Sequence, residues 1–160
     1  MAPLRLSLLL RLWKVEPRCW TLQKAALLEP MPEAQSVEGT GAASLALEGI
    51  AVLCREGVID MRTTVEVLEP RCTVDSQPRV LCSFVRLLAL APSFNVAAPE
   101  YQHFLSSRLS WLWGLAGAVE QPEGVREAAF RAIATWPSEA TSLAMLPTEC
   151  KAGLKMPARF

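Results

Sequence analysis

The central part of this 160-residue chain contains one pattern written twice. Each copy starts with a Gln-Pro pair and continues through an apolar run to a Pro-Ser pair. The first copy spans residues 77–93 and the second spans residues 121–138. An offset of 45 positions places Val125 on Val80, Arg131 on Arg86, Ile133 on Leu88, Ala134 on Ala89, Pro137 on Pro92 and Ser138 on Ser93. This self-similarity predicts that one supersecondary unit occurs twice.

A further apolar run, Glu100–Gly117, lies between the two copies. Helix pairs that recur about every 40 to 47 residues are typical of HEAT and armadillo repeats, which stack side by side. The sequence therefore predicts an all-α fold, an α-solenoid of HEAT/armadillo-like antiparallel helix pairs. Trp111 and Trp113 are two positions apart in this run, hence about 200° apart on a helix. We expect one of them to pack inside its own repeat and the other to meet the adjacent repeat.

The distribution of proline, glycine and apolar residues predicts three regions. Residues 1–41 hold two expected helices and a polar loop, which are Leu4–Lys14, Cys19–Glu29 and Glu29–Gly41. Residues 42–146 form the predicted helical-repeat segment, and residues 147–160 form an irregular tail. Neither end shows the polar capping face that a solenoid needs, so we expect a fragment or a shortened form of a longer array.

Within the repeat segment we expect helices over Ala42–Glu56, Met61–Leu68, Pro78–Leu90, Glu100–Gly117, Pro122–Trp136 and Glu139–Leu146. Gly57 is placed to end the first helix, because glycine enters the left-handed conformation without a Cβ penalty. Asp60 can cap the second helix by accepting from the free amides of its first turn. The third helix has only Arg79, Ser83 and Arg86 as a polar stripe, so we expect it to be buried against more than one neighbour.

The charges of the chain balance. Lysine plus arginine and aspartate plus glutamate each number 16, which leaves no basic excess for neutralising phosphates, so no direct nucleic-acid partner is predicted. The acidic residues Glu120, Glu123 and Glu127 alternate with Arg126 and Arg131. We interpret them as a solvated edge, with a partner-facing patch as the alternative.

The opening segment, Met1–Trp13, resembles a signal peptide only superficially, because Arg11 interrupts its short apolar part and no small-residue cleavage site follows. The Leu-rich helix over residues 4–14 is interpreted as the first solenoid helix, with a cationic interfacial or mitochondrial-type helix as the alternative. No stretch approaches the roughly 18 to 20 apolar residues that span a bilayer. We expect a soluble, cytoplasmic protein without a transmembrane segment.

The five cysteines are odd in number and widely spaced, and they are Cys19, Cys54, Cys72, Cys82 and Cys150. Most lie in or beside apolar helical runs, where free cysteine behaves as a small hydrophobic residue. We therefore expect reduced core thiols, with a disulfide framework as the alternative. No histidine lies near the closest cysteine pair, so no metal site is predicted.

A hydrolase could use the single histidine, His103, with Ser107 four residues later on the same helix face. The neighbouring Ser106 and Ser110 read as ordinary helix-face residues, and no Gly-x-Ser-x-Gly elbow occurs. The Gly39-Thr40-Gly41 stretch lacks a preceding strand and is interpreted as a flexible loop and not as a phosphate cradle. The sequence therefore predicts no catalytic, cofactor-binding or metal-binding residues, and it does not indicate partner-binding residues.

Three segments, Leu45–Asp60, Val80–Val96 and Glu100–Ala116, resemble in order and spacing a part of the focadhesin family of large α-helical repeat proteins. The first copy of the repeat has Leu81 where the second has Arg126, a departure from the usual HEAT pattern. The resemblance implies a non-enzymatic α-solenoid scaffold in the cytoplasm. It also implies association with focal adhesions and with the superkiller complex of cytoplasmic RNA decay. An unrelated HEAT-type adaptor and, more remotely, a small helical hydrolase centred on His103 are the alternatives.

Overall fold

The computed structural model describes residues 37–140, and this part of the chain is all-helical, without strands. Its α-helices are α3 (Val37–Arg55), α4 (Met61–Leu68), α5 (Pro78–Leu88), α6 (Pro99–Gly117) and α7 (Glu123–Ile133). Three short 3₁₀ helices follow α4, α5 and α7, and these are η2 (Glu69–Arg71), η3 (Ala91–Phe94) and η4 (Ser138–Ala140). The predicted all-α class is confirmed. The helices expected over 4–14 and 19–29, most of the one expected over 139–146, and the tail over 147–160 lie outside the described residues.

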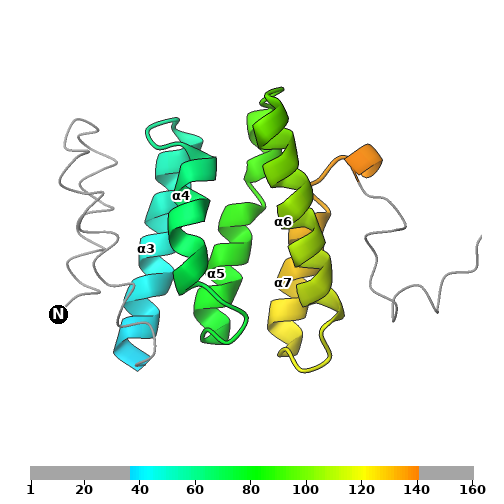
Figure 1. Ribbon diagram of the computed structural model, residues 1–160. Coiled ribbons are helices and arrows are strands. Elements are labelled where there is room, and N and C mark those ends of the chain that lie inside the picture. The colour runs from blue at the N-terminus through cyan, green and yellow to red at the C-terminus, as the bar shows by residue number, and fades with distance from the viewer. Residues whose placement is uncertain (1–36, 141–160) are drawn as a thin grey trace, which may run out of the picture.

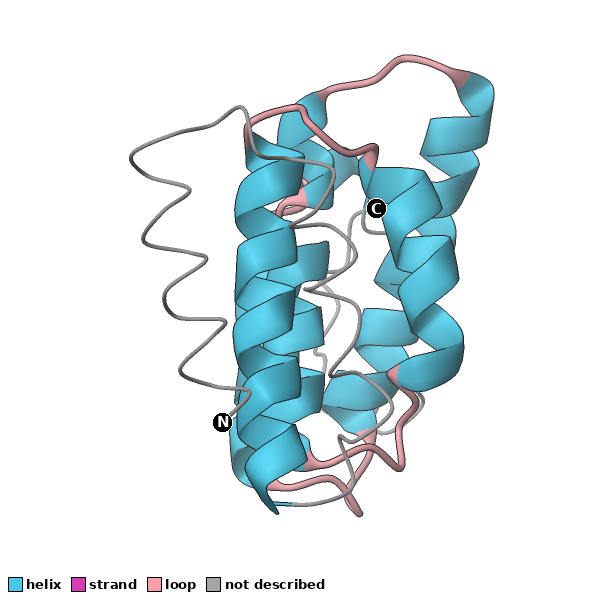
Figure 2. Cartoon of the chain, turned by 90° about the vertical axis from the view of Figure 1, so that its left-hand side faces the viewer, coloured by secondary structure: helices cyan, strands magenta, loops and turns pink. Residues whose placement is uncertain are grey.

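The helices alternate in direction along the chain and form two layers. In Figure 1, α3, α5 and α7 run one way, and α4 and α6 run the other way. Helix α5 packs between α3 and α7, so these three parallel helices form one row, and α6 packs on α7. Figure 2 views the molecule along the row and shows the helices in two columns. We call α3, α5 and α7 the first layer, and α4 and α6 the second layer.

Helix α3 begins at Val37, so the loop expected over 29–41 is wrong at its C-terminal end. Gly39 and Gly41 lie inside the helix, although each glycine costs a helix about 1 kcal/mol relative to alanine. Packing in the tertiary structure compensates for this cost, because Thr40 and the nearby Ala42 and Ala43 are buried. The sequence pattern of this segment does not indicate that these residues are buried.

The turn between α3 and α4 has the predicted caps. Gly57 has φ 70°, its amide donates to the carbonyl of Cys54 at 3.0 Å, and the Val58 amide donates to Leu53 at 3.0 Å. This pair of bonds is a Schellman motif, which satisfies the last carbonyls of α3. The carboxylate of Asp60 then accepts from the Thr63 amide at 2.7 Å and caps α4. Both cap predictions are confirmed.

The repeat in the sequence is also a repeat in the backbone. Helices α5 and α7 have 11 residues each, and their first residues are 45 positions apart. Both end earlier than predicted, at Leu88 and Ile133 and not at Leu90 and Trp136, because the amides of Leu90 and Thr135 bond three residues back, to Leu87 and Ala132, as in a 3₁₀ turn. The chain tightens into a 3₁₀ helix after each one.

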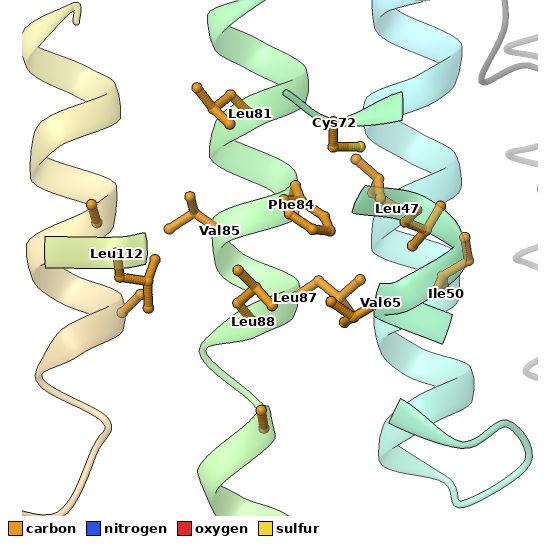
Figure 3. Packing of buried hydrophobic residues seen from close by; sticks show 14 of the residues in the cluster. Leu47, Ile50, Val65, Cys72, Leu81, Phe84, Val85, Leu87, Leu88 and Leu112 are labelled. Atoms are coloured by element: carbon orange, nitrogen blue, oxygen red, sulfur yellow. The ribbon is translucent and has the colours of Figure 1, made fainter. Parts of the chain in front are cut away.

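The central helix α5 is buried on most of its circumference. Figure 3 shows its side chains spreading toward α3 on one side and toward α6 and α7 on the other, and its buried apolar residues are Val80, Leu81, Phe84, Val85, Leu87 and Leu88. The predicted polar stripe is only partly correct, because Ser83 is buried and shares a hydrogen bond of 2.6 Å with Ser44 of α3. Burial of Ser83 is tolerated because its hydroxyl has this partner.

The two tryptophans of α6 contact different helices, as predicted. The Trp111 ring meets Phe84 of α5 edge to face, with ring centroids 5.9 Å apart. The Trp113 ring meets Phe130 of α7 in the same manner, with centroids 6.2 Å apart. Helix α6 therefore contacts both of the repeated helices, α5 and α7, through its aromatic side chains.

Candidate interaction surface

A groove with an apolar floor runs between α3 and α4. Its volume is about 210 Å³, and it is lined by Ile50, Leu53, Ile59, Asp60, Thr63, Thr64 and Val67. We call this the α3–α4 groove. The buried side chains Ile50 and Leu53 form its floor, whereas Val67 is 51% exposed at its rim. An exposed valine beside a groove of this kind is a feature of surfaces that take up an apolar side chain from a partner.

The polar end of the α3–α4 groove is organised by Asp60. One carboxylate oxygen, Oδ2, accepts from both the backbone amide and the Oγ1 hydroxyl of Thr63 at 2.7 Å. These two hydrogen bonds lower the pKa of Asp60 from its ordinary value, so the carboxylate is charged at neutral pH. The groove therefore combines an apolar floor with one negative charge. A hydrophobic side chain flanked by a lysine or arginine matches this chemistry.

A second cavity, of about 280 Å³, lies between the start of α4 and the start of α6. Its lining residues are Cys54, Gly57, Ile59, Asp60, Met61, Phe94, Val96 and Tyr101. Burial raises the pKa of Tyr101 to about 12, and its hydroxyl donates to the Ala91 carbonyl at 2.9 Å. Burial also raises the pKa of Cys54 to about 11. Both groups are protonated at neutral pH, so neither supplies an activated nucleophile.

Neither of the two cavities described above contains His103, the residue of the hydrolase hypothesis. His103 is exposed on α6. The hydroxyls of Ser106 and Ser110 donate to the carbonyls of Gln102 and Ser106, one helical turn earlier. Ser107 accepts a long bond of 3.4 Å from the guanidinium of Arg108. The serines thus behave as the helix-face residues that the sequence suggested.

The described cysteines Cys54, Cys72 and Cys82 are free thiols, in agreement with the prediction for this part of the chain, while Cys19 and Cys150 lie outside it. Burial raises the pKa of Cys72 to about 12 and also raises that of the half-buried Cys82. No group of three or more potential metal ligands occurs within residues 37–140.

The acidic residues predicted to form a solvated edge around α7 are exposed, as expected. Glu127 pairs with Arg131 across one helical turn, with a nitrogen-to-oxygen distance of 2.6 Å. Arg126 does not pair with an acid there, because its Nε donates to the Ala116 carbonyl at 3.3 Å. Glu120 and Glu123 are exposed.

Sequence reasoning missed the α3–α4 groove, although one signal for it was present. Val65 and Val67 are two positions apart on α4, about 200° around the helix. Only one of them can face the core, and Val65 is the buried one. The other valine had to lie at the surface, and this could have indicated an apolar rim.

The matched family model carries the description Focadhesin/RST1, DUF3730, and it covers residues 26–133. Focadhesin from Danio rerio is 34% identical over 114 residues, which are 71% of this chain and 6% of that protein. Focadhesin from Homo sapiens is 28% identical over 133 residues, or 83% of this chain and 7% of that protein. The chain thus spans well under a tenth of the length of these relatives.

No solved structure matches the chain significantly. Among the helices that the structure describes, none is long and apolar enough to cross a membrane. The family match extends over more than half of the sequence, and it includes the repeated helices α5 and α7. The chain therefore belongs to the Focadhesin/RST1 family.

Proposed function

We propose that this chain is a non-enzymatic segment of an α-solenoid scaffold, which binds another protein. The observation that carries the proposal is the structural repeat: two 11-residue helices, 45 positions apart, lie side by side with α6 packed against the second. Stacked helix pairs offer extended surfaces and usually act as binding platforms. Neither the sequence nor the geometry of residues 37–140 identifies a catalytic group that would favour an enzyme.

The α3–α4 groove is the surface that we assign to the partner. Its apolar floor, the exposed Val67 and the charged Asp60 favour a segment with an apolar side chain next to a basic one. A helix or an extended peptide of this composition could bury the valine and place its cation near the carboxylate. Direct binding of nucleic acid is not part of the proposal, since the chain has no net positive charge.

The proposed associations follow the family. We propose a cytoplasmic location and contact with components of focal adhesions or of the superkiller complex. The alternative of an adaptor unrelated to the family is set aside by the family match. The hydrolase alternative has no support from the position of His103, and we do not propose it.

The test is quantitative affinity purification from cytosol with the tagged full chain and two variants. Val67→Glu places a charge at the rim of the α3–α4 groove, and Val119→Glu places the same charge on a 75% exposed valine in the loop before α7. We expect adhesion or superkiller components to be recovered with the wild type and Val119→Glu, and to be reduced several-fold with Val67→Glu.

Circular dichroism and thermal unfolding of each variant check that the fold is intact. Trp111→Ala combined with Trp113→Ala serves as a misfolded reference, because both rings contribute to the core. Recovery of chaperones alone by every folded variant would refute the scaffold proposal for this segment. Equal recovery by Val67→Glu and wild type would refute the assignment of the groove.

A further inference from the structure

The contacts between neighbouring helices differ between the first layer and the second layer. In the first layer, α5 packs directly on α3 and on α7. Hydrogen bonds join these helices along their length. Ser44 bonds Ser83 at 2.6 Å, and the Cys82 thiol donates to the Gly124 carbonyl at 3.7 Å. Just after α7, the Thr135 hydroxyl shares its hydrogen between the Ala89 carbonyl at 2.9 Å and the Ala132 carbonyl at 2.7 Å. The first layer is therefore a close-packed unit with little freedom to change its spacing.

In the second layer, the backbones of α4 and α6 approach each other at fewer points than those of neighbouring helices in the first layer. The cavity of about 280 Å³ separates their first turns, with Met61 on one side and Tyr101 on the other. Farther along, the Arg108 guanidinium of α6 forms an ion pair with the carboxylate of Glu69 in η2, directly after α4. Of the ion pairs in residues 37–140, this is the one that joins two different segments, since the other two each lie within one helix.

The environment of this ion pair makes it sensitive to its surroundings. The Arg108 side chain is 16% exposed and lies over the Phe104 ring, with its guanidinium carbon 5.9 Å from the ring centre. The Glu69 side chain is 46% exposed. The Phe104 ring of the same helix thus positions Arg108, whereas the exposed carboxylate of Glu69 can replace its bond to Arg108 with bonds to water. A partly exposed pair of this kind weakens as salt rises.

We propose that the Arg108–Glu69 ion pair is a clasp that sets the separation of α4 and α6, and that the segment bends about the first layer when the clasp opens. Loss of the pair lets α4 and α6 move apart, because their backbones approach each other at few points and a cavity lies between their first turns, while α3, α5 and α7 keep their spacing. The cavity between Met61 and Tyr101 widens with this motion. The inference concerns the shape of the segment and does not depend on the partner proposed above.

The test measures two distances in the full chain by double electron–electron resonance. Nitroxide labels are attached to genetically encoded ketone residues, so that the native cysteines are retained. One pair, at the exposed positions of Glu66 on α4 and Ser106 on α6, reports on the second layer. The other pair, at the exposed positions of Glu48 on α3 and Ala134 after α7, reports on the first layer.

Glu69→Gln removes the charge of the clasp with little change in shape, and Arg108→Met keeps the apolar stem over Phe104. Both variants, and the wild type in 1 M NaCl, are expected to shift the α4–α6 distances to longer and broader distributions while the α3–α7 distances stay constant. Arg131→Met is the matched control, since it removes an exposed ion pair inside α7. It should leave both distributions unchanged.

Two results would contradict the proposed role of the Arg108–Glu69 ion pair. Unchanged α4–α6 distances in Glu69→Gln and in 1 M NaCl would mean that other contacts set the spacing of the second layer. Broadening in both layers together would mean that the ion pair supports general stability and is not a local clasp. Because Glu69 is nearly half exposed, Glu69→Gln is expected to fold, so either result can be read even if Arg108→Met does not fold.

Discussion

The hydroxyl of Thr135 shares its hydrogen between two carbonyl oxygens, that of Ala89, 46 positions earlier in the chain, at 2.9 Å, and that of Ala132 in α7 at 2.7 Å. The bond to Ala89 joins the C-terminal turn of α7 to the corresponding turn of α5. Ala89 and Ala134 are equivalent under the 45-residue offset, and their amides make matching bonds to Val85 and Phe130. The contact between the two copies therefore joins equivalent turns, one at the end of α5 and one at the end of α7.

Thr135→Val removes the hydroxyl, and with it the hydrogen shared between Ala89 and Ala132, and keeps the shape of the side chain. We expect the free energy of unfolding to fall by about 0.5 to 1.5 kcal/mol, the usual net value of one hydrogen bond. Urea unfolding followed by circular dichroism measures the change. Thr135→Ser retains the hydroxyl and should lie much closer to wild type, and equal losses in both variants would show that the bond contributes nothing.

The two phenylalanines that contact the tryptophans of α6 should differ in how much their replacement by alanine destabilises the fold. Phe84 is fully buried, so Phe84→Ala leaves a cavity and should cost about 3 to 5 kcal/mol. Phe130 is 42% exposed, so Phe130→Ala should cost only about 0.5 to 1.5 kcal/mol, mainly through its contact with Trp113. Chemical denaturation of both variants tests the order, and a reversal would contradict the burial of Phe84.

Two glycines should respond oppositely to alanine. Gly57 has φ 70°, so Gly57→Ala should destabilise the chain by about 1 to 2 kcal/mol, although space for the methyl group is available. Gly124 lies in the first turn of α7, and a methyl group added to it would meet no neighbouring atom within 4 Å, so Gly124→Ala should stabilise by about 0.5 kcal/mol. Thermal unfolding should give melting temperatures on opposite sides of wild type.

The Asp60 cap should make stability depend on pH. Hydrogen bonds from Thr63 lower the pKa of Asp60 in the folded chain below the ordinary value of 3.8. This stabilisation is fully present above that value and is lost as the pH falls through the lower, folded-state pKa. Asp60→Ala should cost about 0.5 to 2 kcal/mol at pH 7, and the difference from wild type should shrink below pH 4.

Asp60→Asn provides the control for this pH dependence. Asparagine also caps helices, but its amide does not titrate in this range. The difference between Asp60→Asn and Asp60→Ala should therefore remain nearly constant from pH 7 to pH 3. A difference between wild type and Asp60→Ala that persists unchanged at pH 3 would argue against a role for the charged carboxylate.

The thiols should differ in reactivity. Cys54 and Cys72 are buried, and burial raises their pKa values to about 11 and about 12, so few of them ionise at pH 8. Cys82 is half-buried and should be alkylated faster than either of them. Peptide mass spectrometry after timed exposure to iodoacetamide ranks the three sites. Rapid alkylation of Cys72 in the folded chain would contradict its position in the core.

Much of the helical fold could be predicted from the sequence because it depends on neighbouring residues. The offset of 45 positions located α5 and α7. The left-handed Gly57 and the capping Asp60 act within one turn of their own helices, so the residue types alone indicate both caps. The ends of the helices were predicted less accurately. After α5 and α7 the chain changes from an α-helix to a 3₁₀ turn, and the residue types do not mark where this change occurs.

Only the tertiary structure decided which residues meet across helices. It buried Ser83 against Ser44, extended α3 back to Val37, and paired Arg108 with Glu69, which is 39 positions earlier. It also formed the α3–α4 groove, which needs side chains from two helices at once. The sequence by itself determined where helices form and how often they recur, since local periodicity carries that information. The contacts between helices came from the tertiary structure, because packing across long separations leaves no regular pattern along one chain.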